Sequence, residues 1–114
     1  MAYYLAVGKL ITVVETASFR ARAKTRMTEQ EVTDAITSIA TDPERGDVMK
    51  ETGGLRKLRF GVGSKGKSGG VRIVYAYKNR AHPVYLLTVF AKNEKDNLTK
   101  AERNALRKVV EGLF

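Results

Sequence analysis

The sequence predicts an α+β fold: a small antiparallel sheet with helices before it and a C-terminal helix after it. Two segments with alternating apolar side chains, residues 55–60 and 71–77, flank a glycine-rich loop, as the strands of a β-hairpin do. A third apolar segment, residues 84–91, follows them, and Thr28 and Thr99 each begin a helix signal. Strands joined by hairpins, with helices gathered at the ends of the chain, are typical of α+β folds.

The chain begins with a strand and a short helix in this prediction. Residues 10–16, LITVVET, are apolar and β-branched and predict the first strand. Residues 1–9 either extend that strand or form a separate N-terminal arm. A short basic helix is expected over residues 18–27, where arginine and lysine are frequent.

The second helix has clear signals at both ends. Thr28 and Glu31 have the spacing of a capping box, in which each side chain satisfies a backbone N–H of the other residue. The helix is expected to end near Thr41, because Pro43 disfavours helix in the residue before it. Residues 43–54 are expected to form a loop that leads into the hairpin.

The remaining elements follow the hairpin. Residues 84–91, VYLLTVFA, are apolar at nearly every position, which predicts a central strand covered on both faces. Thr99 and Glu102 then repeat the capping-box spacing and predict the final helix. Its apolar residues fall on one side of that helix: Ala101, Ala105, Leu106, Val109 and Val110.

Length and composition restrict the class of protein. A chain of 114 residues is expected to form one domain, residues 1–114, with a core that needs no disulfide. There is no cysteine, and the longest run without a charged residue, residues 81–91, is far shorter than the roughly 20 residues of a membrane span. The N-terminus has no pattern of a signal peptide. We therefore expect a cytoplasmic protein that is not bound to a membrane.

Positive charge is concentrated in the second half of the chain. The net charge is +9, yet residues 1–49 hold six Lys/Arg and seven Asp/Glu, whereas residues 50–114 hold fifteen and five. Between Glu51 and Glu94 no acidic residue occurs. Ordinary solvated surfaces mix both signs of charge, so this distribution predicts a binding face for a polyanion, of which nucleic acid is the first candidate.

The hairpin places cations on one face of the sheet. Leu58 points to one side of its strand while Lys57 and Arg59 point to the other, and Arg72 shares this second face with small apolar residues. The pattern predicts a shallow, open cationic face, with Lys92 at the end of the next strand.

Two interpretations of this face remain open. It is either a platform that binds RNA without cutting it, or a site that cleaves RNA. In the cleaving case the 2′-hydroxyl attacks the adjacent phosphorus, arginine stabilises the charge that develops on phosphate, and a lysine accepts a proton. Crowding by other cations lowers the pKa of a lysine and so suits it to that task.

Two further features, a P-loop-like motif and a single histidine, are not expected to form catalytic sites. Residues 61–68, GVGSKGKS, match the phosphate-binding P-loop pattern, but a strand-like segment follows them where that motif needs a helix. A flexible loop whose Lys65 and Lys67 bind phosphate is the favoured interpretation. His82, the one histidine, is expected to be a solvated turn residue. No metal site and no cofactor are expected, because the chain lacks any ligand cluster with suitable spacing.

Three segments resemble the RelE/HigB family of toxins from bacterial type II toxin–antitoxin modules: GDVMKETGGLRKLRF, KGKSGGVRIVYAY and YLLTVFAKNEKDNLTKAE. The resemblance extends over about residues 10–112 and is strongest for the HigB-like branch. It implies a ribosome-dependent endoribonuclease that cuts mRNA. It also implies two partners, mRNA on the ribosome and a cognate antitoxin that is itself a DNA-binding protein.

The resemblance also implies site residues. The catalytic set is Lys57, Arg59, Arg72 and Lys92, and Arg56, Lys65, Lys67 and Lys95 are expected to bind RNA. Family members often have a basic residue where Asn93 stands here, so Lys92 or Lys95 takes that role. No tyrosine follows Tyr85 to act as proton acceptor, which leaves Lys57 as the substitute. The ParE-like relatives, which share the fold but poison gyrase, are the alternative.

Overall fold

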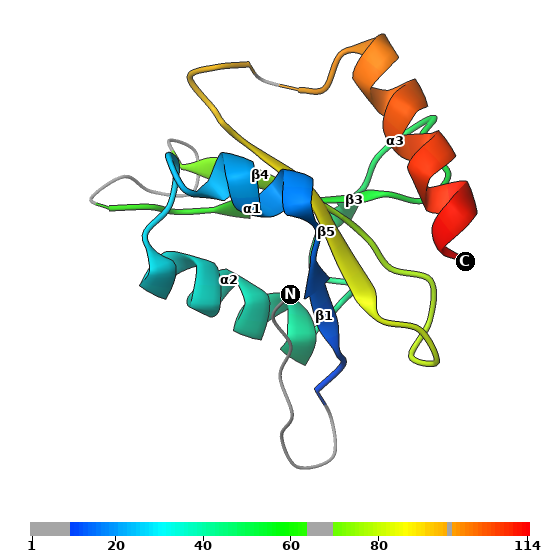
Figure 1. The fold of residues 1–114 in the computed structure, drawn as a ribbon, viewed down its shortest axis with the longest axis horizontal. Coiled ribbons are helices and arrows are strands. Elements are labelled where there is room, and N and C mark those ends of the chain that lie inside the picture. Colours follow the sequence, from blue (N-terminus) through cyan, green and yellow to red (C-terminus); the bar gives the residue numbers. More distant parts are fainter. Residues whose placement is uncertain (1–9, 64–69, 96) are drawn as a thin grey trace.

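The computed structural model describes residues 10–63, 70–95 and 97–114. Within these ranges it contains a five-stranded sheet and three helices, which confirms the predicted α+β class. Figure 1 shows α1 and α2 close together and α3 apart from them. The elements are β1 (Val13–Glu15), α1 (Ala17–Ala23), α2 (Glu29–Thr41), β2 (Asp47–Val48), β3 (Arg56–Phe60), β4 (Val71–Ala76), β5 (Val84–Ala91) and α3 (Lys100–Leu113).

The sheet has the strand order β1-β5-β4-β3-β2. The predicted hairpin is present, with β3 and β4 antiparallel and Arg59 opposite Arg72. Strand β5 pairs with the other side of β4, so that Arg72 also lies opposite Phe90. The register of this second pair shifts between Val74 and Tyr75. The hairpin and β5 therefore form the middle of the sheet.

The prediction of an entirely antiparallel sheet is wrong at one edge. Strand β1 pairs with β5 in the parallel direction, with Val13 opposite Val84. A hairpin turn forces neighbouring strands to be antiparallel, whereas β1 reaches the sheet through no hairpin. The chain passes through α1, α2 and three further strands before it reaches β5, so local turn geometry does not fix the direction of β1.

Two element boundaries also differ from the prediction. Helix α1 ends at Ala23 rather than near residue 27, because the next residues form a turn in which Met27 N–H donates to Ala23 O at 2.9 Å. The segment expected to be a loop, residues 43–54, contains the two-residue strand β2. This strand pairs with β3, Asp47 lying opposite Lys57. A strand of two residues carries too little pattern to be seen in the sequence.

Both capping boxes are present as predicted. Thr28 Oγ1 accepts from Glu31 N at 3.1 Å, and Glu31 Oε1 accepts from Thr28 N at 2.8 Å. Thr99 and Glu102 make the same two contacts at 3.1 and 2.8 Å. Each box satisfies backbone N–H groups that the first helical turn would otherwise leave without a partner.

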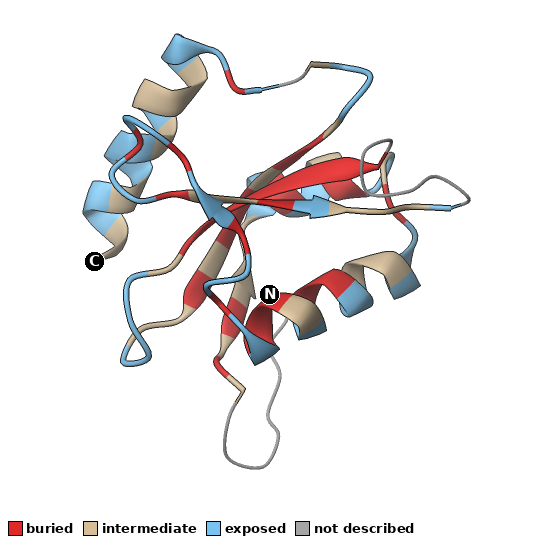
Figure 2. Cartoon of the chain, turned by 180° about the vertical axis from the view of Figure 1, so that it is seen from behind, coloured by how far each residue is buried: buried red, intermediate tan, exposed pale blue. Residues whose placement is uncertain are grey.

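The sheet separates two apolar clusters. On one face Phe19 of α1 and Ile36 of α2 pack against Ile73 and Tyr75 of β4, among other residues. On the other face Val74 of β4 packs with residues of β5, of the segment before β3 and of α3. All six residues of β4 are buried, as the uniformly buried centre of the sheet in Figure 2 shows.

Helix α3 covers its face of the sheet only in part. None of its residues is fully buried, and in Figure 2 the helix shows only intermediate and exposed residues. Leu106 and Val110 pack against the second cluster. Ala101, Ala105 and Val109, which the sequence places on the same apolar side, are exposed, Val109 by 49%. The helix therefore uses a narrower apolar stripe than its sequence suggests.

The Tyr75 hydroxyl joins the core to the segment before β2. This side chain is fully buried, and its hydroxyl donates to Pro43 O at 2.8 Å and accepts from Gly46 N at 2.8 Å. Gly46 approaches the ring so closely that a Cβ atom there would lie 2.8 Å from the Tyr75 oxygen. The backbone of β2 is thus positioned by a hydrogen-bonded side chain of the central strand.

We expect Tyr75→Phe to lower the free energy of unfolding by about 1–3 kcal/mol, because it leaves a buried N–H and a buried carbonyl without their partner. Urea unfolding measures the effect. Tyr85→Phe, which removes a hydroxyl from a half-buried position of β5, is the matched control and should change the midpoint much less. Equal losses in the two variants would contradict this account of Tyr75.

Candidate nucleic-acid interface

Two cations of β3 lie on the α3 side of the sheet. Lys57 and Arg59 alternate with Leu58, which is 8% exposed and belongs to the opposite apolar cluster. Lys57 is half-buried and Arg59 is exposed. Because residues directly opposite each other in a sheet share a face, Arg59, Arg72 and Phe90 form a row across three strands. The predicted side of the sheet for these cations is confirmed.

The expectation of an open face around Arg72 is wrong. Arg72 is only 6% exposed, and its neighbours Val74 and Ala76 are 0% and 2% exposed. The small side chains on this face leave room that apolar residues of β5 and α3 fill, including Leu87 and Leu106. Of the two arginines in this row, Arg59 is therefore at the surface and Arg72, beside it on β4, is buried.

A cleft of about 420 Å³ opens beside the exposed cations. On one side it is bounded by β2, β3 and the segment after β2. On the other side it is bounded by the start of α3 and the residues just before that helix. Four basic residues line it: Lys50, Lys57, Arg59 and Arg103. Asp47, Glu51 and Asn97 are its other polar residues. The structure thus brings Lys57 and Arg59 together in one concave, mainly cationic site.

Arg103 is a cleft residue that the sequence did not suggest. It lies in the first turns of α3, and its Nη1 donates to Leu98 O at 3.0 Å. A basic residue near the start of an amphipathic helix is ordinary on a solvated surface, so sequence alone gives no signal for it. Only the packing of α3 against the sheet places it opposite Lys57 and Arg59.

The rim of the cleft has a tightly specified backbone. Glu51 has φ of +59°, an unusual value for a residue other than glycine, and Gly53 and Gly54 follow with φ of +75° and +99°. Between them Thr52 is fully buried; its hydroxyl donates to Met49 O at 2.8 Å and accepts from Leu55 N at 3.1 Å. These contacts hold the rim in a conformation that most sequences would not adopt.

Arg56 lies outside the cleft. Its side chain shares the face of Leu58, and Nη1 donates to the carbonyls of Glu44 at 3.0 Å and Gly46 at 2.8 Å. Its Nη2 is also 3.7 Å from a Glu44 carboxylate oxygen. The structure thus uses Arg56 to hold the segment before β2, and does not bring it together with Lys57 and Arg59.

The two lysines after β5 have different surroundings. Lys92 is exposed, and its backbone N–H donates to Gly70 O at 3.1 Å. Lys95 forms an ion pair with Glu102 of α3, and its Nζ lies 5.4 Å from the centre of the Phe90 ring. The Lys95 ammonium and the capping contact with Thr99 lower the pKa of Glu102 below its ordinary value. Neither lysine lines the cleft.

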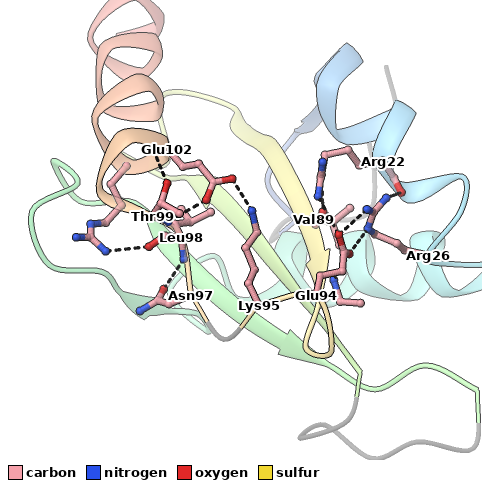
Figure 3. Close-up of polar contacts among 11 residues, drawn as sticks. Arg22, Arg26, Val89, Glu94, Lys95, Asn97, Leu98, Thr99 and Glu102 are labelled. Carbon is pink, nitrogen blue, oxygen red and sulfur yellow. Dashed lines mark hydrogen bonds and ion pairs between the residues drawn. The ribbon is translucent and has the colours of Figure 1, made fainter.

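Figure 3 shows the polar contacts that hold Glu94, Lys95 and residues 97–102 between α1 and α3. The Glu94 carboxylate accepts hydrogen bonds from Arg26 Nε at 2.5 Å, from Arg26 Nη2 at 2.8 Å and from the N–H of Ala91 at 2.8 Å. Arg22 Nη2 is 3.5 Å from the same carboxylate. These contacts lower the pKa of Glu94 from 4.5 to about 2, and the hydrogen bond from Arg26 has the largest effect. A few residues later Asn97 Oδ1 lies 3.5 Å from Lys57 Nζ.

Two of the predicted residues lie outside the described ranges. Lys65 and Lys67 belong to residues 64–69, as does most of the P-loop-like motif. The strand expected after that motif is present as β4, which confirms that no helix follows at that place. His82 lies in a turn as predicted, but it is half-buried, and its ring meets Phe114 edge-on at 5.4 Å.

The described residues contain neither a cluster of metal ligands nor a helix that could span a membrane. In residues 10–63, 70–95 and 97–114, no three histidine or acidic side chains come close enough together to hold a metal ion. In the same ranges no helix is sufficiently long and apolar to span a bilayer.

Comparison with protein families gives one match. The family model described as "RelE toxin of RelE / RelB toxin-antitoxin system" matches residues 11–114. The matched region includes every helix and strand described above, together with the cleft and both ion-paired segments.

The low pKa of Glu94 predicts how its contribution to stability depends on pH. A carboxyl whose pKa is lower in the folded than in the unfolded state stabilises the fold above its unfolded pKa, and this is lost as pH falls through the folded pKa. We expect the difference in unfolding free energy between the parent and Glu94→Gln to be constant near neutral pH and to narrow between pH 4.5 and about 2.

Urea unfolding at a series of pH values tests this prediction. Glu44→Gln is the control, because the Glu44 carboxylate is 71% exposed and 3.7 Å from Arg56, so its removal should change stability little at any pH. A gap between the parent and Glu94→Gln that stays constant down to pH 2 would contradict the ion-paired state of Glu94.

Proposed function

This chain belongs to the RelE toxin family, and we propose that it is a ribosome-dependent endoribonuclease that cleaves mRNA. The family match gives the coarser statement directly: the protein is a toxin of a toxin–antitoxin system. The finer proposal adds the target, mRNA in the decoding site, and the location, the cytoplasm where ribosomes translate. It also adds a reaction that uses amino-acid side chains and no metal ion.

The observation that carries the proposal is the cleft itself. Lys57 and Arg59 of β3 and Arg103 of α3 line one hollow of about 420 Å³ at the surface. Cations from separate elements that converge on one hollow can surround a phosphate group, which a flat basic surface cannot do. A concave cationic site is suited to holding one phosphodiester and stabilising charge that develops on it.

The chemistry assigns roles to these side chains. The 2′-oxygen forms a bond to phosphorus while the bond to the 5′-oxygen breaks, leaving a cyclic phosphate and a 5′-hydroxyl. Lys57, acting as a neutral amine, accepts the proton of the 2′-hydroxyl, Lys92 donates a proton to the departing 5′-oxygen, and Arg59 stabilises the doubly charged phosphorane through its forked donors. Arg72, buried beside Arg59 on the neighbouring strand, adds positive electrostatic potential to the site.

The remaining basic residues bind RNA outside the reacting phosphate. Lys92 is exposed at the end of β5 and is the candidate to reach the leaving group or an adjacent phosphate. Lys65, Lys67 and Lys95 are proposed to hold the RNA backbone, Lys95 after release from its ion pair with Glu102. Arg56 contributes by fixing the segment before β2 rather than by binding RNA.

The antitoxin of this system is proposed to silence the toxin by occupying the same cleft. An acidic or apolar segment would match the cations that line the site and the exposed Val48 at its edge, which is 58% exposed. Charge complementarity of this kind favours fast and specific association. Such an antitoxin would bind operator DNA with its other part.

One alternative function fits the same family. A relative that poisons gyrase, or that binds RNA without cutting it, would have the fold and the positive charge but no phosphodiester cleavage. The convergence of Lys57, Arg59 and Arg103 favours cleavage, because a gyrase poison has no need of a hollow in which cations from two elements meet.

Primer extension on cellular mRNA after induction of the protein tests the proposed reaction. We expect new 5′ ends within translated regions, and we expect Lys57→Met and Arg59→Met to lower single-turnover cleavage on ribosomes by about 100- to 1000-fold each. Lys108→Met, which removes an exposed cation of α3 outside the cleft, is the matched control. Intact mRNA with the parent protein would overturn the proposal in favour of the alternative.

Salt dependence tests whether the cleft residues bind phosphate. Each phosphate that the protein neutralises contributes about −0.7 to the slope of log affinity against log salt for single-stranded RNA. We expect a steep slope for the parent and a slope shallower by roughly that amount for Arg59→Met, with Lys108→Met closer to the parent. An affinity that does not respond to salt would contradict electrostatic binding of RNA.

A further inference from the structure

The connection between β5 and α3, residues 92–99, lies beside the cleft and outside the sheet. Its first residue, Lys92, donates its N–H to Gly70 O at 3.1 Å, and strand β5 itself ends at Ala91. Leu98, near the end of the connection, is 4% exposed and packs in the apolar cluster under α3. After strand pairing has ended, Glu94 is held by a backbone turn, in which its N–H donates to Ala91 O at 3.0 Å, and Glu94 and Lys95 are held by side-chain ion pairs.

Adjacent residues of this connection bind helices on opposite faces of the sheet. Glu94 binds Arg22 of α1 and Arg26 of the turn that follows α1, while Lys95 binds Glu102 of α3 (Figure 3). Helix α1 packs on one apolar cluster and α3 on the other. The two ion pairs therefore hold the connection from both sides at the same level of the sheet.

The anchor at Glu94 is geometrically strong for an ion pair at the surface. Both Arg26 Nε and Arg26 Nη2 donate to the carboxylate, which is the forked arrangement with the best directional fit. Arg22 is itself fixed, because its Nε donates to Val89 O of β5 at 2.9 Å. The Glu94 carboxylate also receives the N–H of Ala91, the last residue of β5.

We propose that Glu94 is a positioning residue for the cleft: its bonds to Arg22 and Arg26 fix the connection that places Asn97 against Lys57. The proposal rests on the proposed ribonuclease function. Asn97 lines the cleft and its Oδ1 lies 3.5 Å from Lys57 Nζ, so movement of the connection changes the surroundings of the proposed proton acceptor.

Charge gives this proposal a distinctive signature. Glu94 is a carboxylate in the basic half of the chain, so its negative charge opposes RNA binding. Its replacement by glutamine should leave RNA affinity equal or slightly higher. If the connection loses its position, cleavage should slow at the same time, because misplacement of about 1 Å in a catalytic site can cost about 100-fold in rate.

The experiment compares Glu94→Gln with Glu44→Gln in the full chain on ribosomes. Both changes remove one negative charge from a carboxylate that is ion-paired to an arginine, so they share any general effect of charge. We expect single-turnover cleavage to fall by at least about 10-fold in Glu94→Gln only, with ribosome occupancy at least equal to that of the parent. Arg26→Met should slow cleavage similarly, and the double variant should lose little more.

The outcomes decide the proposal. Equal cleavage rates for the two glutamine variants would overturn it, whatever their thermal stabilities, because a purely structural ion pair changes stability without selecting the chemical step. Cleavage losses in Glu94→Gln and Arg26→Met that simply multiply in the double variant would also overturn it, because the two residues would then act separately.

A readout that does not depend on cleavage separates failure of this inference from failure of the proposed function. If the parent protein leaves mRNA intact, the ribonuclease function fails. Hydrogen exchange at the Leu98 amide, which donates to Asn97 Oδ1 at 3.0 Å, then still reports on the anchor. We expect faster exchange there in Glu94→Gln than in Glu44→Gln, and equal exchange would overturn the positioning role.

Discussion

Burial of β4 on both faces is the constraint on which the rest of the structure depends. Every residue of this strand is buried, Arg72 included, so each face of the sheet needs its own apolar cover. Helices α1 and α2 supply one cover, and α3 with the segment before β3 supplies the other. Because α3 covers its face only in part, the cleft remains open where that helix begins, beside the exposed side of β3.

The alternation of side chains along β3 places its cations on opposite faces of the sheet, where they have different roles. Arg56 points to the face of Leu58 and holds backbone carbonyls before β2, whereas Lys57 and Arg59 point to the cleft. A register slip of one residue would exchange these sets and would place Leu58 in the cleft. The Tyr75 hydroxyl therefore bears indirectly on function, because it joins β4 to the segment before β2, and β3 is registered between these two strands.

The positive charge of the chain is divided between structure and substrate. Arg22 and Arg26 are committed to Glu94, and Lys95 is committed to Glu102, so these cations position the connection beside the cleft. In the proposed function, the lysines and arginines that line the cleft attract phosphate. A net charge of +9 thus overstates the number of cations available to the proposed RNA substrate, because Glu94 and Glu102 hold some of them in ion pairs.

Patterns within short stretches of sequence predict the elements whose signals are local: the hairpin, β5, both capping boxes and the cationic side of β3. Those signals depend on residues a few positions apart, so periodicity and capping chemistry reveal them. The parallel pairing of β1, the burial of Arg72 and the arrival of Arg103 in the cleft were decided only by the tertiary structure. Each depends on which distant segments pack together, because burial and proximity are set by the balance of apolar contacts over the whole chain rather than by any short stretch of it.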